Sequence, residues 1–274
     1  MSFPKILFKS RGGGAVFSRL IYGKLWYDIF SGDLSLYTNP GSVWSIISGV
    51  AIDATVNWGH QLYTTSAMAQ ANYIVECDIK PRLAYPQFMA RLTASNNFYF
   101  IAMAEGSPGY FRLYKRLAGS DTQIGSSGAP TILDNTWYTI RFDLQGTALK
   151  GYFSNVLQAS ATDSSITAAG SIGPLGGGAG TSYSIDNLKC FTSNIITMVG
   201  LATGAKFRIR KSDTTVIATS AAAANGVATI NTTALADRPP YYDLQIAVDG
   251  TNFTITDTTF LNDIWGGDTY RYCG

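Results

Sequence analysis

Charged side chains are scarce in this sequence. Lys, Arg, Asp and Glu make up 14 % of its 274 residues, against about a quarter in a typical globular protein. The 20 basic and 18 acidic residues nearly cancel, which leaves a net charge of +2. So weak a field does not attract nucleic acid, and we expect no nucleic-acid partner. Few charges are also typical of a surface that neighbours cover, although Ser, Thr, Asn and Gly can keep a β-sandwich soluble.

Histidine and cysteine are few as well. His60 is the single histidine, and no G-x-S-x-G sequence accompanies it, which argues against a Ser-His-Asp triad. Cys77, Cys190 and Cys273 show neither disulfide-framework nor zinc-ligand spacing. We expect three free thiols, buried where they lie on strands, in a protein that matures in a reducing compartment.

Long apolar runs are missing too. No stretch reaches the roughly 20 residues of a membrane helix, so no membrane span is expected. The first residues do not resemble a signal peptide, because Lys9 and Arg11 interrupt the apolar run and residues 12–14 are glycines. We therefore expect synthesis in a cytoplasm without export by the common route.

Alternating apolar and polar residues dominate what is present. Residues 73–80, 110–116 and 137–144 alternate, and residues 97–103 are almost wholly apolar, which indicates a central strand buried on both faces. Such short strands, separated by Gly, Ser and Asn, predict an all-β fold built as an antiparallel sandwich.

The chain divides into three predicted parts. A boundary follows Phe191, after which short strands and turns indicate a second, smaller β-sandwich. The predicted parts are an N-terminal arm (1–24), a large sandwich (25–192) and a small C-terminal β-sandwich domain (193–274). The arm is basic. It is either a solvated tail or a segment that docks on an acidic or polar partner. Its basic residues are Lys5, Lys9, Arg11, Arg19 and Lys24.

The large sandwich resembles a known family. It opens on Asp28-Ile29-Phe30-Ser31-Gly32-Asp33, places Trp44 and Gly49 next, and closes on Tyr183-Ser184-Ile185-Asp186-Asn187-Leu188-Lys189-Cys190-Phe191. That order resembles the concanavalin A-like jelly roll of laminin-G modules, legume lectins and family-16 glucanases. The resemblance implies an antiparallel jelly roll with a surface for sugar or protein contact.

The catalytic pattern of the family-16 glucanases is incomplete here. The resemblance implies Glu, Asp and Glu alternating along one strand, whereas this chain has Glu76, Asp78 and Lys80. Glycoside hydrolysis needs two carboxyls facing each other, roughly 5–10 Å apart, and Lys80 would form an ion pair instead. We therefore predict that the protein is not an enzyme.

Outward-facing polar and aromatic side chains predict a glycan-binding surface instead. Sugar sites combine aromatic groups with fixed polar groups, and these strands would form one such surface if they are neighbours. The alternative is an ordinary solvated sheet face or a subunit interface. The predicted residues are Glu76, Asp78, Arg91, Tyr110, Arg112, Tyr114, Arg141, Asp143 and Tyr152.

The resemblance also implies one structural calcium ion where the first and last strands meet. Asp186 matches the aspartate of the last strand, and Asp28 lies on the opening strand. Carboxylate and carbonyl oxygens are the ligands that calcium takes. The alternative is that Asp186 is an edge residue or a turn cap, and no other cofactor is expected.

Taken together, these features resemble virion proteins of tailed bacteriophages, in which concanavalin A-like modules decorate capsids, head fibres and tails. The resemblance implies a non-enzymatic virion structural protein, partnered by itself as a homo-oligomer and by other virion proteins, with an outer face for host or environmental glycans. The alternative is a free carbohydrate-binding protein or a degenerate family-16-like glycosidase.

Overall fold

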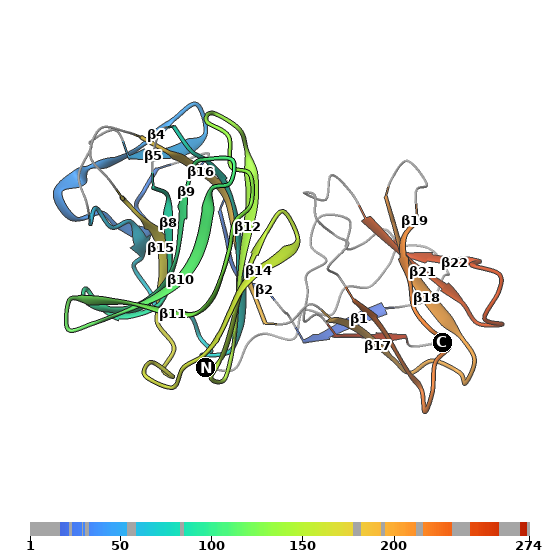
Figure 1. Cartoon of the computed structure of the whole chain (residues 1–274). Coiled ribbons are helices and arrows are strands. Elements are labelled where there is room, and N and C mark those ends of the chain that lie inside the picture. The colour runs from blue at the N-terminus through green and yellow to red at the C-terminus, as the bar shows by residue number, and fades with distance from the viewer. Residues whose placement is uncertain are drawn as a thin grey trace. The chain divides into compact units, whose positions relative to one another are not determined.

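The computed structural model confirms an all-β architecture (Figure 1), in which strand pairing is antiparallel throughout the larger sandwich and parallel between residues 197–199 and 269–271 of the smaller one. Every described element is a strand except the one-turn 3-10 helix η1 (Pro40–Ser42). No helix in this part of the chain is long and apolar enough to cross a membrane. The described residues are 17–21, 24–28, 30, 33–53, 59–82, 85–177, 182–192, 195–211, 216–231, 242–257 and 269–272.

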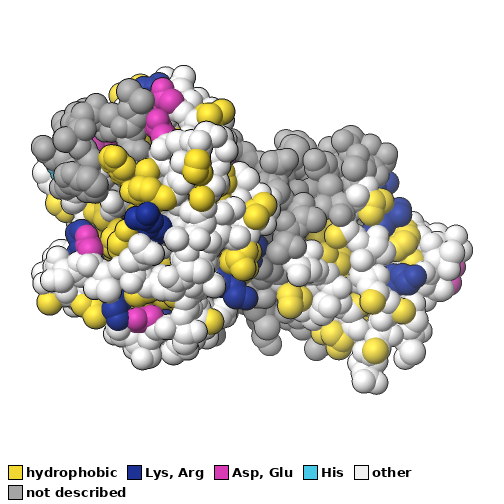
Figure 2. Space-filling model, viewed as in Figure 1, with side chains coloured by type: hydrophobic (Ala, Val, Ile, Leu, Met, Phe, Trp, Pro, Cys, Tyr) yellow, Lys and Arg dark blue, Asp and Glu magenta, His cyan; other side chains and the backbone are white. Residues whose placement is uncertain are grey.

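The chain forms two compact units. One comprises Leu25–Cys190, and the other combines Met1–Lys24 with Phe191–Gly274. Charged side chains are sparse on the described surface shown in Figure 2, most of which is white, the colour of uncharged polar side chains and of the backbone. This sparseness follows directly from the 14 % charged composition.

The larger unit contains a five-stranded antiparallel sheet in the order β11-β10-β9-β8-β15. Its strands are β8 (Gln87–Ala94), β9 (Asn97–Ala104), β10 (Tyr110–Leu117), β11 (Ser120–Gly128) and β15 (Ser171–Leu175).

An eight-stranded sheet forms the second layer, in the order β14-β13-β12-β7-β16-β5-β4, with β2 pairing to β16. A two-stranded ribbon of β3 (Tyr37–Thr38) and β6 (Tyr63–Thr64) lies beside β15 of the five-stranded sheet. The eight strands are β2 (Lys24–Asp28), β4 (Trp44–Ile47), β5 (Val50–Asp53), β7 (Tyr73–Lys80), β12 (Tyr138–Gln145), β13 (Ala148–Phe153), β14 (Val156–Thr162) and β16 (Ser184–Phe191).

The inner faces of these two sheets share one core. Val75, Cys77 and Ile79 of β7 are buried in it, as are Phe111 and Leu113 of β10. These are the inward positions that strict alternation predicts. Burial of each large apolar side chain contributes about 1.5–3 kcal/mol, and this contribution fixes which face of each strand turns inward.

The central strand β9 is buried on both faces, as predicted. Tyr99 and Ile101 enter the main core, whereas Phe98 and Phe100 belong to a second apolar cluster on the other side of the sheet. The five-stranded sheet therefore has an apolar outer face as well as an apolar inner one. The outer face is where a candidate site arises.

One edge of the sandwich is closed by contact between β11 and β14. The Ser160 N–H donates to Ser126 Oγ over 2.8 Å. Gly125 has a positive φ of +67°, and a Cβ there would lie 2.0 Å from the Ser160 carbonyl oxygen. Glycine is needed at this position because the two backbones approach too closely for any side chain.

At the other edge of the five-stranded sheet, residues 59–64 run beside β15. The Leu62 N–H donates to the Pro174 carbonyl over 3.1 Å, and backbone bonds of 2.9 and 2.7 Å join Gly176 to Gly59 and His60. The ring of His60 lies 3.4 Å from the buried Asp53 carboxylate. His60 is thus part of the support for this segment.

Cys77 and Cys190 are buried free thiols, as predicted. Burial raises the pKa of both well above the ordinary value for a thiol. Cys273 lies outside the described residues.

The smaller unit is also a β-sandwich. One four-stranded sheet has the order β1-β23-β17-β20 and the other β19-β18-β21-β22. Residues of both sheets, such as Met198 and Phe207, share one apolar core. The strands are β1 (Phe17–Ile21), β17 (Ile195–Val199), β18 (Lys206–Lys211), β19 (Val216–Thr219), β20 (Val227–Asn231), β21 (Tyr242–Ala247), β22 (Ile255–Asp257) and β23 (Thr269–Tyr272).

Candidate functional site

The predicted glycan-binding residues fall on two different sheets. Tyr110, Arg112 and Tyr114 lie on β10, in the five-stranded sheet. The eight-stranded sheet brings together the residues of β7, β12 and β13, which are Glu76, Asp78, Arg141, Asp143 and Tyr152. The condition for one continuous surface, that these strands are neighbours, is therefore not met, because β10 does not neighbour β7 or β12.

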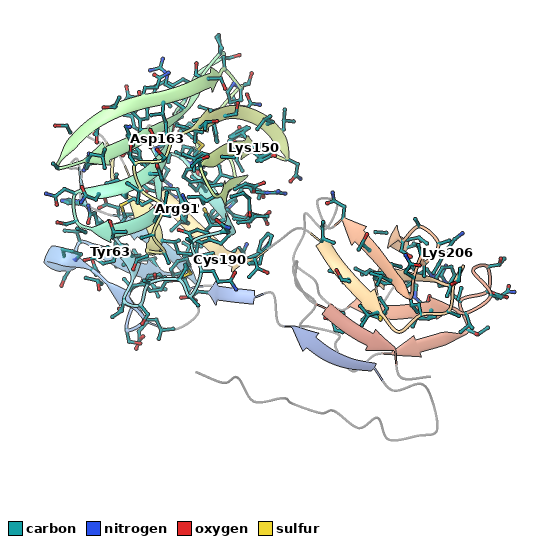
Figure 3. The ribbon with its side chains drawn as sticks, turned by 90° about the horizontal axis from the view of Figure 1, so that it is seen from below. Tyr63, Arg91, Lys150, Asp163, Cys190 and Lys206 are labelled. Atoms are coloured by element: carbon teal, nitrogen blue, oxygen red, sulfur yellow. The ribbon has the colours of Figure 1, made fainter. Side chains whose placement is uncertain are left out.

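Arg91 belongs to neither surface, so its prediction as an outward residue was also wrong. Its side chain is 0 % exposed and lies inside the larger unit (Figure 3). The pairing of β8 with β9 shifts register between Ala90 and Ala94, and Arg91 has a positive φ of +51°. This irregularity breaks the alternation and turns Arg91 inward.

The charged face of the eight-stranded sheet is paired within itself. Lys189 Nζ lies 3.0 Å from Glu76 Oε1, and Arg141 holds Asp143 through two bonds of 2.5 and 2.7 Å. The Arg141 guanidinium also lies 4.8 Å from the centre of the Tyr152 ring. Because these charges satisfy one another, few polar groups on this face are left for a ligand.

Asp78 is engaged in the same way. It accepts a hydrogen bond of 2.7 Å from Thr139 Oγ1 and another from Asn187 Nδ2. Lys80, which stands at the third position of the glucanase pattern, lies over the Trp137 ring at 5.1 Å. Glu76 and Asp78 thus serve as ion-pair and hydrogen-bond partners, which is the arrangement expected of structural carboxylates.

Replacement of Glu76 by glutamine should therefore affect stability. The Glu76 and Lys189 side chains are only 11 % and 13 % exposed, and loss of one partner of a buried pair costs about 3–5 kcal/mol. We expect a loss near the lower end of that range, because glutamine keeps the shape and one acceptor. Urea unfolding of Glu76→Gln, Lys189→Met and the double variant measures the coupling. Additive effects would contradict the pairing.

The outer face of the five-stranded sheet carries partly exposed aromatic rings. We define the aromatic face as the outward aromatic and arginine side chains of β9 and β10, together with Tyr85, which stacks on Tyr110, and Tyr63, which packs on the same apolar cluster. Its residues, of which Phe98 and Phe100 are buried, are Phe98, Phe100, Tyr110, Arg112, Tyr114, Arg116, Tyr63 and Tyr85. Met89, Leu92, Ala102 and Leu175 form its buried floor.

Ring contacts keep this face in place. Phe100 and Tyr114 stack with centroids 5.1 Å apart, and Tyr85 stacks on Tyr110 at 6.3 Å. The Arg112 guanidinium lies over Tyr110 at 4.4 Å. Such contacts contribute about 0.5–1.5 kcal/mol each, so the rings are fixed in position before any ligand arrives.

Tyr110 remains a neutral hydroxyl at ordinary pH. Burial raises its pKa first, and the neighbouring Tyr114 and Tyr85 hydroxyls raise it further, whereas Arg112 lowers it. The three tyrosines therefore provide hydroxyl groups that can donate or accept hydrogen bonds beside flat apolar rings. This combination is what sugar sites use.

Sequence reasoning missed Tyr63 and Tyr85 on this face. Both lie outside the long alternating strands. Tyr85 stacks on Tyr110 of β10, whereas Tyr63 of β6 lies beside β15 and packs on the outer apolar cluster. Their position depends on the order of strands, which local alternation does not encode.

The predicted calcium ligands lie on paired strands. Asp28 is the last residue of β2, Asp186 belongs to β16, and these strands are neighbours. Asp28 accepts the Phe30 N–H at 2.7 Å, and Asp186 accepts the Asn187 N–H at 2.7 Å. The described residues contain no group of three or more metal-ligating side chains. These two carboxylates do not by themselves fit the six to eight oxygens of calcium, and the ion stays a prediction.

The predicted assembly arm is described only in part. Lys5, Lys9 and Arg11 lie outside the described residues. Arg19 belongs to β1, which pairs with β23, and Lys24 begins β2. At least residues 17–21 of the basic segment therefore form a strand of the smaller unit.

Comparison with solved structures identifies the fold of the larger unit. The carbohydrate-binding module CBM66 of Bacillus subtilis is similar, with 16 % identity and a TM-score of 0.51 over 57 % of this chain and 95 % of that chain. The jelly-roll fold that the resemblance implied is thereby confirmed.

More distant likenesses are found among glucanases. The Bacillus licheniformis β-glucanase has 16 % identity and a TM-score of 0.43 over 68 % of this chain and 96 % of its own. A β-1,3-glucanase from Mycobacterium marinum has 13 % identity and a TM-score of 0.43 over 61 % and 98 %. Neither a protein-family model nor a curated protein sequence matches this chain.

Proposed function

We propose that this protein is a non-enzymatic glycan-binding protein whose aromatic face holds the sugar. The single observation that carries this proposal is the cluster of partly exposed tyrosines beside Arg112 on the five-stranded sheet. Sugar rings have apolar C–H faces and a rim of hydroxyls, and this surface supplies flat rings and polar groups together. The similar module from Bacillus subtilis, whose name describes it as carbohydrate-binding, accords with the proposal.

The charged face of the eight-stranded sheet is less suited to this task. Its carboxylates are occupied by Lys189, Arg141, Thr139 and Asn187. A ligand would have to break these contacts before it could form its own, and each broken charge-assisted bond costs affinity.

Replacement of Tyr114 by alanine tests the proposal directly. The variant should weaken binding to any glycan found on an array by about tenfold or more, which corresponds to about 1.4 kcal/mol. Tyr152→Ala, a matched change on the other sheet, should bind as the wild type does. Isothermal titration calorimetry measures both variants, and unfolding curves verify that each is folded.

Two results would contradict this assignment. If Tyr152→Ala loses binding and Tyr114→Ala does not, the ligand lies on the eight-stranded sheet. If no glycan binds with or without calcium, the protein is not a glycan-binding protein. Turnover of β-glucans that disappears in Glu76→Gln would instead favour the degenerate-glycosidase alternative.

We further propose that the protein acts as a structural component of bacteriophage particles, as a homo-oligomer with other virion proteins. The support is the resemblance to phage jelly-roll modules and the low charge, 14 % of residues. Light scattering and electron microscopy of native material test this role. A large ordered assembly would support it, and a monomer that never joins a particle would favour a free carbohydrate-binding protein.

A further inference from the structure

Arg112 differs from three other cations of the larger unit, Arg116, Arg141 and Lys115. Arg116 is held by Asp121 through two bonds of 2.6 and 2.7 Å, Arg141 by Asp143, and Lys115 by Asp163 at 2.6 Å. The Arg112 side chain, by contrast, has no hydrogen-bond or ion-pair partner among the residues that the structure describes. Its contact is the stack of its guanidinium on the Tyr110 ring, 4.4 Å away.

The strand neighbours of Arg112 give its guanidinium no hydrogen-bond acceptor. It lies opposite Ala102 on β9 and Ser127 on β11, both short side chains that do not reach its guanidinium as partners. Asp121 is the outward carboxylate that contacts an arginine in the described part of this sheet. Both of its oxygens accept hydrogen bonds from Arg116, so it is not available to Arg112. The aromatic face therefore carries one positive charge that no carboxylate of the described chain neutralises.

Stacking on Tyr110 also orients the guanidinium. The contact with the ring restricts the rotation of the Arg112 side chain before a ligand binds. Less side-chain entropy is therefore lost on binding. Its donors form a flat fork that matches the two oxygens of a carboxylate. A neutral sugar would leave this fork partly unsatisfied and the charge unbalanced.

We infer that the aromatic face takes an acidic glycan, with Arg112 binding the carboxylate of a uronic or similar acidic sugar while Tyr110 and Tyr114 contact its ring. This inference rests on the proposed function and specifies its ligand class. Charge complementarity supports it, since the surface offers an unpaired, pre-oriented cation among aromatic rings and no free carboxylate in its described part.

Binding of matched acidic and neutral sugars tests the inference. The probes are oligogalacturonate against its fully methyl-esterified form, and sialyllactose against lactose. Each pair shares its sugar framework and differs in the carboxylate or the acidic residue. At 0.15 M salt we expect at least one acidic probe to bind about 10- to 100-fold more tightly than its neutral counterpart, the range that charge-assisted hydrogen bonds give.

Variants then assign that preference to one side chain. Arg112→Gln should lower the affinity for the acidic probe to that of the neutral probe. Arg112→Lys keeps the charge but loses the fork, and should fall between the two. Lys150→Gln removes the same charge from the eight-stranded sheet, and Figure 3 shows Lys150 and Tyr63 on different sides of the unit. This charge-matched control should bind as the wild type does.

The outcomes separate the inference from the proposed function. Equal binding of acidic and neutral probes, both lost in Tyr114→Ala, would overturn the acidic ligand and retain the glycan site. Equal losses of affinity for the acidic probe in Arg112→Gln and Lys150→Gln would show that the protein attracts acidic sugars through its overall charge. That result would overturn the role of Arg112. Tighter binding of dextran sulfate than of any carboxylate probe would overturn the assignment to a carboxylate. Absence of binding to every glycan would overturn both proposals.

Discussion

Replacement of Arg91 by alanine should lower the free energy of unfolding of the larger unit by about 3–5 kcal/mol, the cost of removing one member of a buried polar network. The effect should be large because Arg91 ties together segments that are distant in the chain. Its backbone N–H donates to the Tyr73 hydroxyl at 2.7 Å, and its Nε and Nη1 atoms donate to the carbonyls of Ala71 and Ile166 at 3.0 and 2.9 Å.

Most of this loss of stability would come from the Ala71 and Ile166 carbonyls left without their donor, and less would come from removal of the charge. Burial lowers the pKa of Arg91, and neighbouring Tyr73 and Tyr99 offset this only in part. The Nη2 atom is buried and has no hydrogen-bond partner within the described chain. A charge in such a place is itself costly, but alanine would leave a cavity and two carbonyls without their donor.

Three variants separate these contributions, measured by urea unfolding. Arg91→Lys supplies one donor group and should recover part of the loss. Arg91→Met fills the space without donors and should be less destabilised than Arg91→Ala, since only the alanine variant leaves a cavity. If Arg91→Ala unfolds within about 1 kcal/mol of the wild type, the network does not stabilise the fold as described.

Arg91 also shows where sequence reasoning succeeds and where it stops. Alternation correctly predicted that Val75 and Phe111 point into the core and that Tyr114 points outward. It failed at Arg91, because a register shift and a positive φ are properties of one irregular position. Burial of apolar side chains is strong enough to fix the regular part of a strand, but a bulge depends on the neighbouring strand.

The candidate site was only half predictable for a related reason. The outward face of β10 could be identified from Tyr110, Arg112 and Tyr114 alone. That Glu76 and Arg141 occupy the other sheet could not, since strand order is set by contacts between distant segments. The pairing of β1 with β23 is a second example, because it joins residues near the two ends of the chain.

Gly173→Ala should disturb both the fold and the aromatic face. Gly173 lies opposite Met89 in the pairing of β15 with β8. A Cβ at this position would lie 1.9 Å from the Leu62 carbonyl oxygen and 2.9 Å from the Tyr63 Cα. Both are backbone atoms, so the clash cannot be relieved by rotating a side chain.

The segment that carries Tyr63 would therefore have to move away from β15. That movement would break the 3.1 Å bond from the Leu62 N–H to the Pro174 carbonyl. It would also withdraw Tyr63 from the apolar cluster on the outer face of the five-stranded sheet. We expect a stability loss of about 3 kcal/mol, at the upper end of ordinary overpacking, and weaker glycan binding in the molecules that remain folded.

Gly119→Ala is the matched control, because it adds the same methyl group in the turn between β10 and β11. Gly119 has a positive φ of +85°, yet nothing lies within 4 Å of an added Cβ. It should cost about 1 kcal/mol through backbone strain alone and leave glycan binding unchanged. Urea unfolding and calorimetric titration of both variants compare the effect of backbone strain at residue 119 with the effect of displacing the segment that carries Tyr63. Equal losses of stability and binding in the two variants would mean that the position of residues 62–63 does not depend on the missing side chain at 173. A loss of glycan binding in Gly173→Ala alone would show that the aromatic face depends on this one close backbone contact.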